Sequence, residues 1–207
     1  MSNLGADLDS EYLLSDYPVI EQCVLLNCRY VNDGRPFWQY IVSSSTGCWD
    51  SQYFEELYNY YTTEKACHLC DPDAEKVFKN LRNAGVKLAV LSNFDTRLRS
   101  VLRALECDYG FDVVAVSAEV EAEKPNPTIF IKACELLGVK PEDAVHVGDD
   151  RRNDMWGARD VGCNAWLWGS DVNSFKEVSL TTSLLLLASK LHEPHAFLIC
   201  ISVCARL

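Results

Sequence analysis

The sequence of 207 residues predicts an α/β fold, with a parallel β-sheet that follows a smaller group of helices. Two patterns support this prediction. From residue 71 onward, short apolar runs alternate with amphipathic stretches, which is typical of βαβ units and a parallel sheet. Residues 17–66 instead carry aromatic side chains at helical spacing. We therefore expect a Rossmann-like sheet preceded by a partial helical lobe.

The helical lobe is expected to contain two helices. Phe37–Val42 is typical of a short helix, and Ser51 is expected to cap a second one in which Phe54 and Tyr58 recur at helical spacing. A turn over residues 43–48 separates them. The many aromatic side chains indicate packing between helices rather than a ligand site.

The sheet is expected to begin after a helix capped by Asp71, with Pro72 at its first position and Gly85 at its end. Gly138 and Gly162 end two later helices in the same way. The other expected elements are strands over residues 86–91, 111–116, 144–147 and 165–168, and helices over residues 96–105, 127–137 and 153–161. The expected domains are 1–66 for an irregular N-terminus and the partial lobe, 67–178 for the sheet, and 179–207 for a divergent tail.

Composition restricts the class of partner. The net charge of −11 and the absence of a Lys/Arg cluster argue against nucleic acid. The apolar runs of the tail, residues 184–187 and 197–204, are far shorter than the ~20 residues of a membrane span.

No secretory signal is visible, so a cytoplasmic location with free thiols is expected, with an organellar stroma as the alternative for a longer relative. The spacing of Cys67 and Cys70 could indicate a metal or redox pair, but no second ligand pair is obvious, and buried thiols are favoured.

Polar residues follow three of the expected strands. These are Ser92 and Asn93, then Lys124 in a proline-rich loop, then the acids Asp149, Asp150 and Asp154. The carboxyl ends of parallel strands meet at one edge of the sheet, where the binding crevice of such folds lies. A hydroxyl, an ammonium and several carboxylates at one edge suit a phosphoryl group and a magnesium ion.

Each of these residues also has a purely structural interpretation. Ser92 could cap the following helix, and Lys124 could be a solvated loop cation. Asp149 and Asp154 could cap the helix of residues 153–161 and interact with its dipole. The order of the three groups, each at a strand end, favours a phosphate site with Ser92, Asn93 and Lys124 as catalytic residues and Asp149 and Asp154 as metal ligands.

The same residues carry a family resemblance. The segments LSNFDTRLR, EKPNPTIF and HVGDD resemble the motifs of the haloacid dehalogenase-like (HAD) hydrolase superfamily, and with WLWGSDV they are most similar to its domain-containing protein 3 branch in a plant-type sequence. The resemblance covers roughly residues 30–175. It implies a Rossmann-like core with a helical cap, Mg²⁺ dependence and phosphatase activity on a small phosphorylated metabolite. It also implies that Ser92 binds phosphate, Lys124 stabilises charge, Asp149 binds the metal and Asp154 supports the metal site.

One part of the family pattern is absent. Members of the superfamily begin with a central strand that ends in an aspartate nucleophile, whereas no apolar strand precedes residue 17 here. Asp7 and Asp9 imitate the spacing of that motif, but the residues before them are not typical of a strand. The chain therefore resembles a truncated or alternatively spliced product. We expect a sheet with a gap at its centre and impaired turnover, and the alternative is a non-catalytic HAD-like module that serves as an interaction or regulatory protein.

Overall fold

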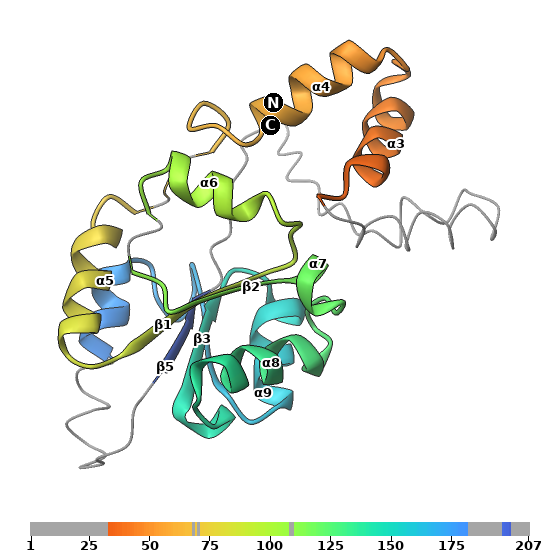
Figure 1. Ribbon diagram of the computed structural model, residues 1–207. Coiled ribbons are helices and arrows are strands. Elements are labelled where there is room, and N and C mark those ends of the chain that lie inside the picture. Colours follow the sequence, from red (N-terminus) through yellow and green to blue (C-terminus); the bar gives the residue numbers. More distant parts are fainter. Residues whose placement is uncertain (1–32, 68, 70, 108–109, 182–195, 200–207) are drawn as a thin grey trace.

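The computed structural model describes residues 33–67, 69, 71–107, 110–181 and 196–199 (Figure 1). Its centre is a sheet of five parallel strands: β1 (Lys87–Ser92), β2 (Val113–Val116), β3 (Ala144–Gly148), β4 (Asn164–Leu167) and β5 (Ala196–Ile199). The strand order is β2-β1-β5-β3-β4. The predicted α/β fold with a parallel sheet is therefore confirmed. None of the described helices is both long and apolar enough to cross a membrane.

Helices cover both faces of the sheet. They are α5 (Ala74–Asn83), α6 (Leu98–Ala104), α7 (Ser117–Val120), α8 (Pro127–Leu137), α9 (Gly157–Asp160), the π-helix η2 (Arg151–Trp156), the short 3-10 helix η1 (Pro141–Asp143) and a last helix over residues 175–181. In Figure 1, α5 lies on one side of the sheet, and α8 and α9 lie on the other. Because both faces are covered, the strands read as continuous apolar runs in the sequence.

Strand β1 shows this burial most clearly. Leu88 and Val90 pack into one core cluster together with α5 and α6, while Ala89 and Leu91 pack into a second cluster together with α8. All four side chains are fully buried. Successive residues of a strand point to opposite faces, so one strand contributes to both cores.

The helical lobe consists of the two predicted helices, α3 (Arg35–Thr46) and α4 (Ser51–Tyr60). The turn predicted over residues 43–48 is wrong in its first part, because α3 continues through Thr46. Gly47 ends α3 in the left-handed conformation, with φ of 71°. The predicted cap of α4 is one residue off. Ser51 is the first helical residue, and the preceding Asp50 is the N-cap, whose carboxylate accepts a hydrogen bond of 2.7 Å from the backbone N–H of Tyr53.

The start of the first core helix also differs from the prediction. Helix α5 begins at Ala74 with Asp73 at the cap position, so Asp71 is not the N-cap and Pro72 is not its first helical residue. Instead, the buried carboxylate of Asp71 accepts hydrogen bonds from the backbone N–H groups of Asp73, at 2.8 Å, and Phe175, at 2.6 Å. Asp71 therefore joins the beginning of the core to a segment 104 residues later.

The centre of the sheet is the main departure from the sequence prediction. No gap is present there, because β5 pairs with β1 on one side and with β3 on the other. The sequence pattern predicts a divergent tail over residues 179–207, yet the second apolar run of this tail supplies the central strand. The backbone N–H and C=O groups of β1 and β3 thus have partners that a gap would have denied them.

Candidate functional site

The carboxyl edge of the sheet brings the predicted polar loops together. Val90 of β1 pairs with Ile199 of β5, which pairs with Val147 of β3. Ser92 comes two residues after Val90, and Asp149 comes two residues after Val147, so both lie at the same level of the edge. Since β5 lies between them, their backbones are separated by two strand spacings, or roughly 10 Å.

Asn93 joins the loop after β1 to the loop that carries Lys124. Its amide nitrogen donates to the carbonyl oxygen of Lys124 at 3.0 Å, and its amide oxygen accepts from the backbone N–H of Lys124 at 2.6 Å. The side-chain amide of Asn93 thus pairs with both backbone polar groups of Lys124, as a peptide group of a neighbouring strand would. Asn93 therefore fixes the position of Lys124 relative to Ser92.

Lys124 continues the connection to the third loop through a buried ion pair. Its ammonium lies 2.5 Å from a carboxylate oxygen of Asp154, and the same oxygen lies 2.8 Å from Nε2 of His146. The second oxygen of Asp154 accepts from the backbone N–H of Asp150 at 3.0 Å. The side chains of Lys124, Asp154 and His146 are 5%, 2% and 0% exposed.

The electrostatics of this group depend on Asp154. Burial opposes ionisation of its carboxyl group, but the hydrogen bond from His146 and the positive charge of Lys124 outweigh burial and hold the pKa of Asp154 well below its ordinary value. Asp154 is therefore a carboxylate at neutral pH, and it keeps the ammonium of Lys124 in one place.

His146 is the residue of this group that sequence reasoning missed. It lies in β3, between Val145 and Val147, with the ring of Phe130 against it at 5.2 Å in an edge-to-face arrangement. A histidine inside an otherwise apolar strand was the available signal, because a fully buried imidazole needs a polar partner. That partner is Asp154, eight residues further along the chain.

The three acids after β3 have different positions. Asp150 is the N-cap of η2, and its carboxylate accepts from the backbone N–H of Asn153. The helix thus begins before the predicted residue 153, and neither Asp149 nor Asp154 caps it. Asp149 is exposed at the edge of the sheet, whereas Asp154 is buried below it.

The predicted metal ligands do not form a complete metal site. Both oxygens of Asp154 are already engaged by Lys124, His146 and the backbone of Asp150. Within the described ranges, no group of three or more His, Cys, Asp or Glu side chains could hold a metal ion. Of the two predicted ligands, the exposed Asp149 is therefore the one that could contact a Mg²⁺ ion, whose other ligands would come from water or from a bound phosphate.

Gly148 is required by the close approach of Asp154. A Cβ atom at position 148 would lie 2.2 Å from Cγ and 2.5 Å from Oδ2 of Asp154. We expect Gly148→Ala to lower the free energy of unfolding by about 3 kcal/mol, the upper range for overpacking of a core. Gly169→Ala is the control: its Cβ would meet nothing within 4 Å, but φ there is +82°, so only a backbone cost of about 1 kcal/mol is expected. Urea denaturation measures both, and equal losses would contradict the steric explanation.

The structure thus joins Asn93, Lys124 and Asp154 by hydrogen bonds and places Ser92 and Asp149 at the same edge. Ser92 is buried, with 8% of its surface exposed. The alternative nucleophile Asp7 lies outside the described residues, and so does Cys70 of the Cys67–Cys70 pair. Cys67 itself is a buried free thiol.

This chain is similar to several known proteins. The family model for haloacid dehalogenase-like hydrolases matches residues 12–162. N-acylneuraminate-9-phosphatase of Mus musculus is 32% identical over 148 residues, which are 70% of this chain and 58% of that protein. Haloacid dehalogenase-like hydrolase domain-containing protein 3 of Xenopus laevis is 39% identical over 113 residues, 55% of this chain and 46% of that protein. The chain spans about half the length of these curated relatives.

Solved structures agree with the sequence relatives. The crystal structure of a HAD phosphatase from Thermococcus onnurineus has 26% sequence identity and a TM-score of 0.55, with 77% of this chain and 76% of that chain covered. The 2-haloacid dehalogenase from Pseudomonas syringae pv. Tomato DC3000 has a TM-score of 0.57 over 86% of each chain, and at 16% identity this likeness concerns the fold alone. The predicted family is confirmed, and the chain belongs to the haloacid dehalogenase-like hydrolases.

Proposed function

We propose that the carboxyl edge of the sheet binds a small phosphate ester. The observation that carries this proposal is the chain of contacts from Asn93 to Lys124 and from Lys124 to Asp154, with Ser92 and Asp149 at the same level of the edge. A phosphate group needs donors and a positive charge in a fixed geometry. Ser92 and Lys124 are the described residues of this edge that would supply them.

Each residue has one role in this proposal. The hydroxyl of Ser92 would donate a hydrogen bond to a phosphate oxygen, and Lys124 would stabilise the negative charge of the phosphoryl group. Asp154 would orient Lys124, and Asn93 would hold the two loops together. Asp149 would hold Mg²⁺, which when bound would neutralise charge on the phosphate oxygens.

We also propose that hydrolysis is impaired. The resemblance to the family places a nucleophilic aspartate at the end of the central strand, and here the central strand is β5. Residues 200–207, which come after β5 in this sequence, contain no aspartate or glutamate. Without a carboxylate to attack phosphorus, the two-step route through a covalent intermediate is not open to this strand. The same observation favours the second candidate, a non-catalytic module that binds a phosphorylated ligand.

Binding and turnover test these proposals separately. Calorimetry with inorganic phosphate and Mg²⁺ is expected to show binding that Ser92→Ala weakens about tenfold, because a hydrogen bond to a charged group is lost. With p-nitrophenyl phosphate, we expect little or no release of p-nitrophenol. Absence of phosphate binding would contradict the proposed site. Sustained release that depends on Mg²⁺ and disappears in Asp149→Asn would instead contradict impaired hydrolysis.

A further inference from the structure

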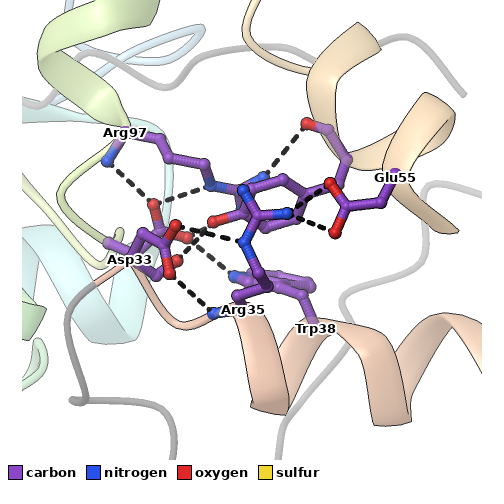
Figure 2. A network of polar contacts seen from close by, with 7 residues as sticks. Asp33, Arg35, Trp38, Glu55 and Arg97 are labelled. Atoms are coloured by element: carbon purple, nitrogen blue, oxygen red, sulfur yellow. Dashed lines mark hydrogen bonds and ion pairs between the residues drawn. The ribbon is translucent and has the colours of Figure 1, made fainter. Parts of the chain in front are cut away.

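The joint between the helical lobe and the core is built from a group of side chains that the phosphate site does not use. We call Trp38, Tyr58, Asp95 and Arg97 the Arg97 clamp. Trp38 and Tyr58 belong to α3 and α4, whereas Asp95 and Arg97 lie in the loop between β1 and α6. Figure 2 shows this network from close by.

The core side of the clamp is a buried ion pair. The guanidinium of Arg97 binds Asp95 with both arms of its fork, through Nε at 2.9 Å and Nη2 at 2.7 Å. The two side chains are 12% and 3% exposed. Asp95 also accepts from the backbone N–H of Arg97 at 2.9 Å. Such a bidentate pair fixes the guanidinium plane as well as its charge.

The lobe contacts this ion pair from two helices. The indole Nε1 of Trp38 donates to Asp95 at 2.7 Å, and Nη1 of Arg97 donates to the carbonyl oxygen of Tyr58 at 3.3 Å. The ring of Tyr58 lies between two guanidinium groups, with Arg97 at 3.7 Å and Arg35 at 4.4 Å from its centroid. Both distances are within the range of cation–π attraction.

The lobe side is itself held in place. Arg35 pairs with Glu55, so α3 and α4 are linked across the lobe, as Figure 2 shows. Burial raises the pKa of Tyr58, so its hydroxyl stays protonated and donates to the carbonyl oxygen of Asp33 at 2.7 Å. The two helices therefore meet the core as one body.

The clamp shares its loop with the proposed phosphate site. Ser92 and Asn93 come directly before Phe94 and Asp95, and Asn93 is bonded to Lys124. The carbonyl oxygen of Phe94 accepts from the hydroxyl of Ser117 at 3.1 Å, which fixes the loop from the other side. A movement of the lobe that displaces Asp95 would thus displace the residues that face the anion.

We propose that the Arg97 clamp couples the position of the helical lobe to the loop of Ser92 and Asn93, with Arg97 as a positioning residue for the anion site. This coupling to an anion rests on the proposed function. Because energetic coupling between two sites is reciprocal, loosening the lobe weakens anion binding, and a bound anion steadies the lobe. The mobility of the lobe therefore depends on whether an anion is bound at the edge of the sheet.

Hydrogen exchange measured by mass spectrometry on the full chain tests the coupling without any ligand. In Arg97→Met, amide exchange over residues 35–60 is expected to become at least about tenfold faster, because Asp95 is left as a buried charge without its main partner. Arg97→Lys is expected to resemble Arg97→Met, since an ammonium cannot reproduce the fork and the stacking. Arg99→Met is the matched control: Arg99 is an exposed residue of α6 that pairs with Glu119 at 3.0 Å, and its loss should leave the lobe unchanged.

The reciprocal variant is made on the lobe. Trp38→Phe keeps an aromatic ring but removes the N–H group that donates to Asp95, so amide exchange over residues 92–97 is expected to become faster.

Inorganic phosphate should bind about tenfold more weakly to Arg97→Met than to Arg99→Met, given a coupling of ordinary size. Unchanged exchange of the lobe in Arg97→Met, or of the loop in Trp38→Phe, would overturn the proposal. If the native chain binds no phosphate, the proposed function fails and the anion half of the coupling fails with it, while the exchange data still decide whether the clamp joins lobe and loop.

Discussion

Replacement of Leu198 by proline is expected to lower the free energy of unfolding by about 3 kcal/mol or more. Leu198 is in the middle of β5, where it pairs with Ala89 of β1 and His146 of β3. Proline has no backbone N–H and is tolerated in sheets at edges and bulges, not in a strand with partners on both sides. The substitution would also leave a buried carbonyl group of a neighbouring strand without its donor.

Urea denaturation followed by circular dichroism measures this effect, with Leu198→Ile as the control because it keeps the N–H and suits a strand. We expect the midpoint of Leu198→Ile to lie close to that of the native chain, and the midpoint of Leu198→Pro to lie far below it. Equal midpoints for the native chain and Leu198→Pro would mean that β5 does not carry the centre of the sheet.

The sequence was sufficient for the elements whose signals are local. Gly138 ends α8, as predicted, and Asn93 and Lys124 were chosen as site residues from their positions after apolar strands. The prediction for Gly138 is confirmed because a helix cap depends on neighbouring residues. The roles of Asn93 and Lys124 remain predictions, although the structure joins the two residues by hydrogen bonds. Errors at the N-caps Asp50 and Asp73 have the same origin, since several adjacent residues could each serve as a cap.

The position of β5 in the sheet has no comparable local signal. The sequence shows its apolar run, but the composition of four strand residues does not determine which strands they pair with. The pairing follows from long-range geometry: β1 and β3 are both buried and need partners, and the tail is the segment that fills the space between them. A prediction from sequence order alone left that space empty.

The Arg97 clamp was missed for a similar reason. The sequence pattern places Arg97 in the helix over residues 96–105 and indicates that the aromatic side chains of Trp38 and Tyr58 pack within the lobe. Each interpretation is locally reasonable, because charged residues on helices are usually solvated and aromatic residues usually pack. Only the approach of Trp38 to Asp95, which are 57 residues apart, shows that they form one network.

Replacement of Lys124 by methionine is expected to destabilise the chain by about 3 kcal/mol at pH 7, because Asp154 remains as a buried charge without its cation. Methionine keeps the length and apolar stem of lysine, so the change removes charge more than volume. Lys132→Met is the matched control: Lys132 pairs with Glu135 at 3.3 Å on the exposed face of α8, and its loss is expected to cost less than about 0.5 kcal/mol. Chemical denaturation at pH 7 compares the two variants.

The pH dependence distinguishes loss of the ion pair from loss of packing. In the native chain the pKa of Asp154 is depressed, so the stability that its ionised form contributes is complete above its unfolded pKa of about 3.9 and is lost as the pH falls below that value. Without Lys124, burial is opposed by His146 and by the backbone N–H of Asp150 but no longer by the positive charge of lysine, so the pKa of Asp154 rises. Protonation then relieves the buried charge in the variant at a higher pH than in the native chain. The difference in unfolding free energy between the native chain and Lys124→Met is therefore expected to be greatest at pH 7 and to decrease toward pH 4. A difference that stays constant over this range would mean that the variant loses packing, and that the ion pair between Lys124 and Asp154 does not stabilise the site.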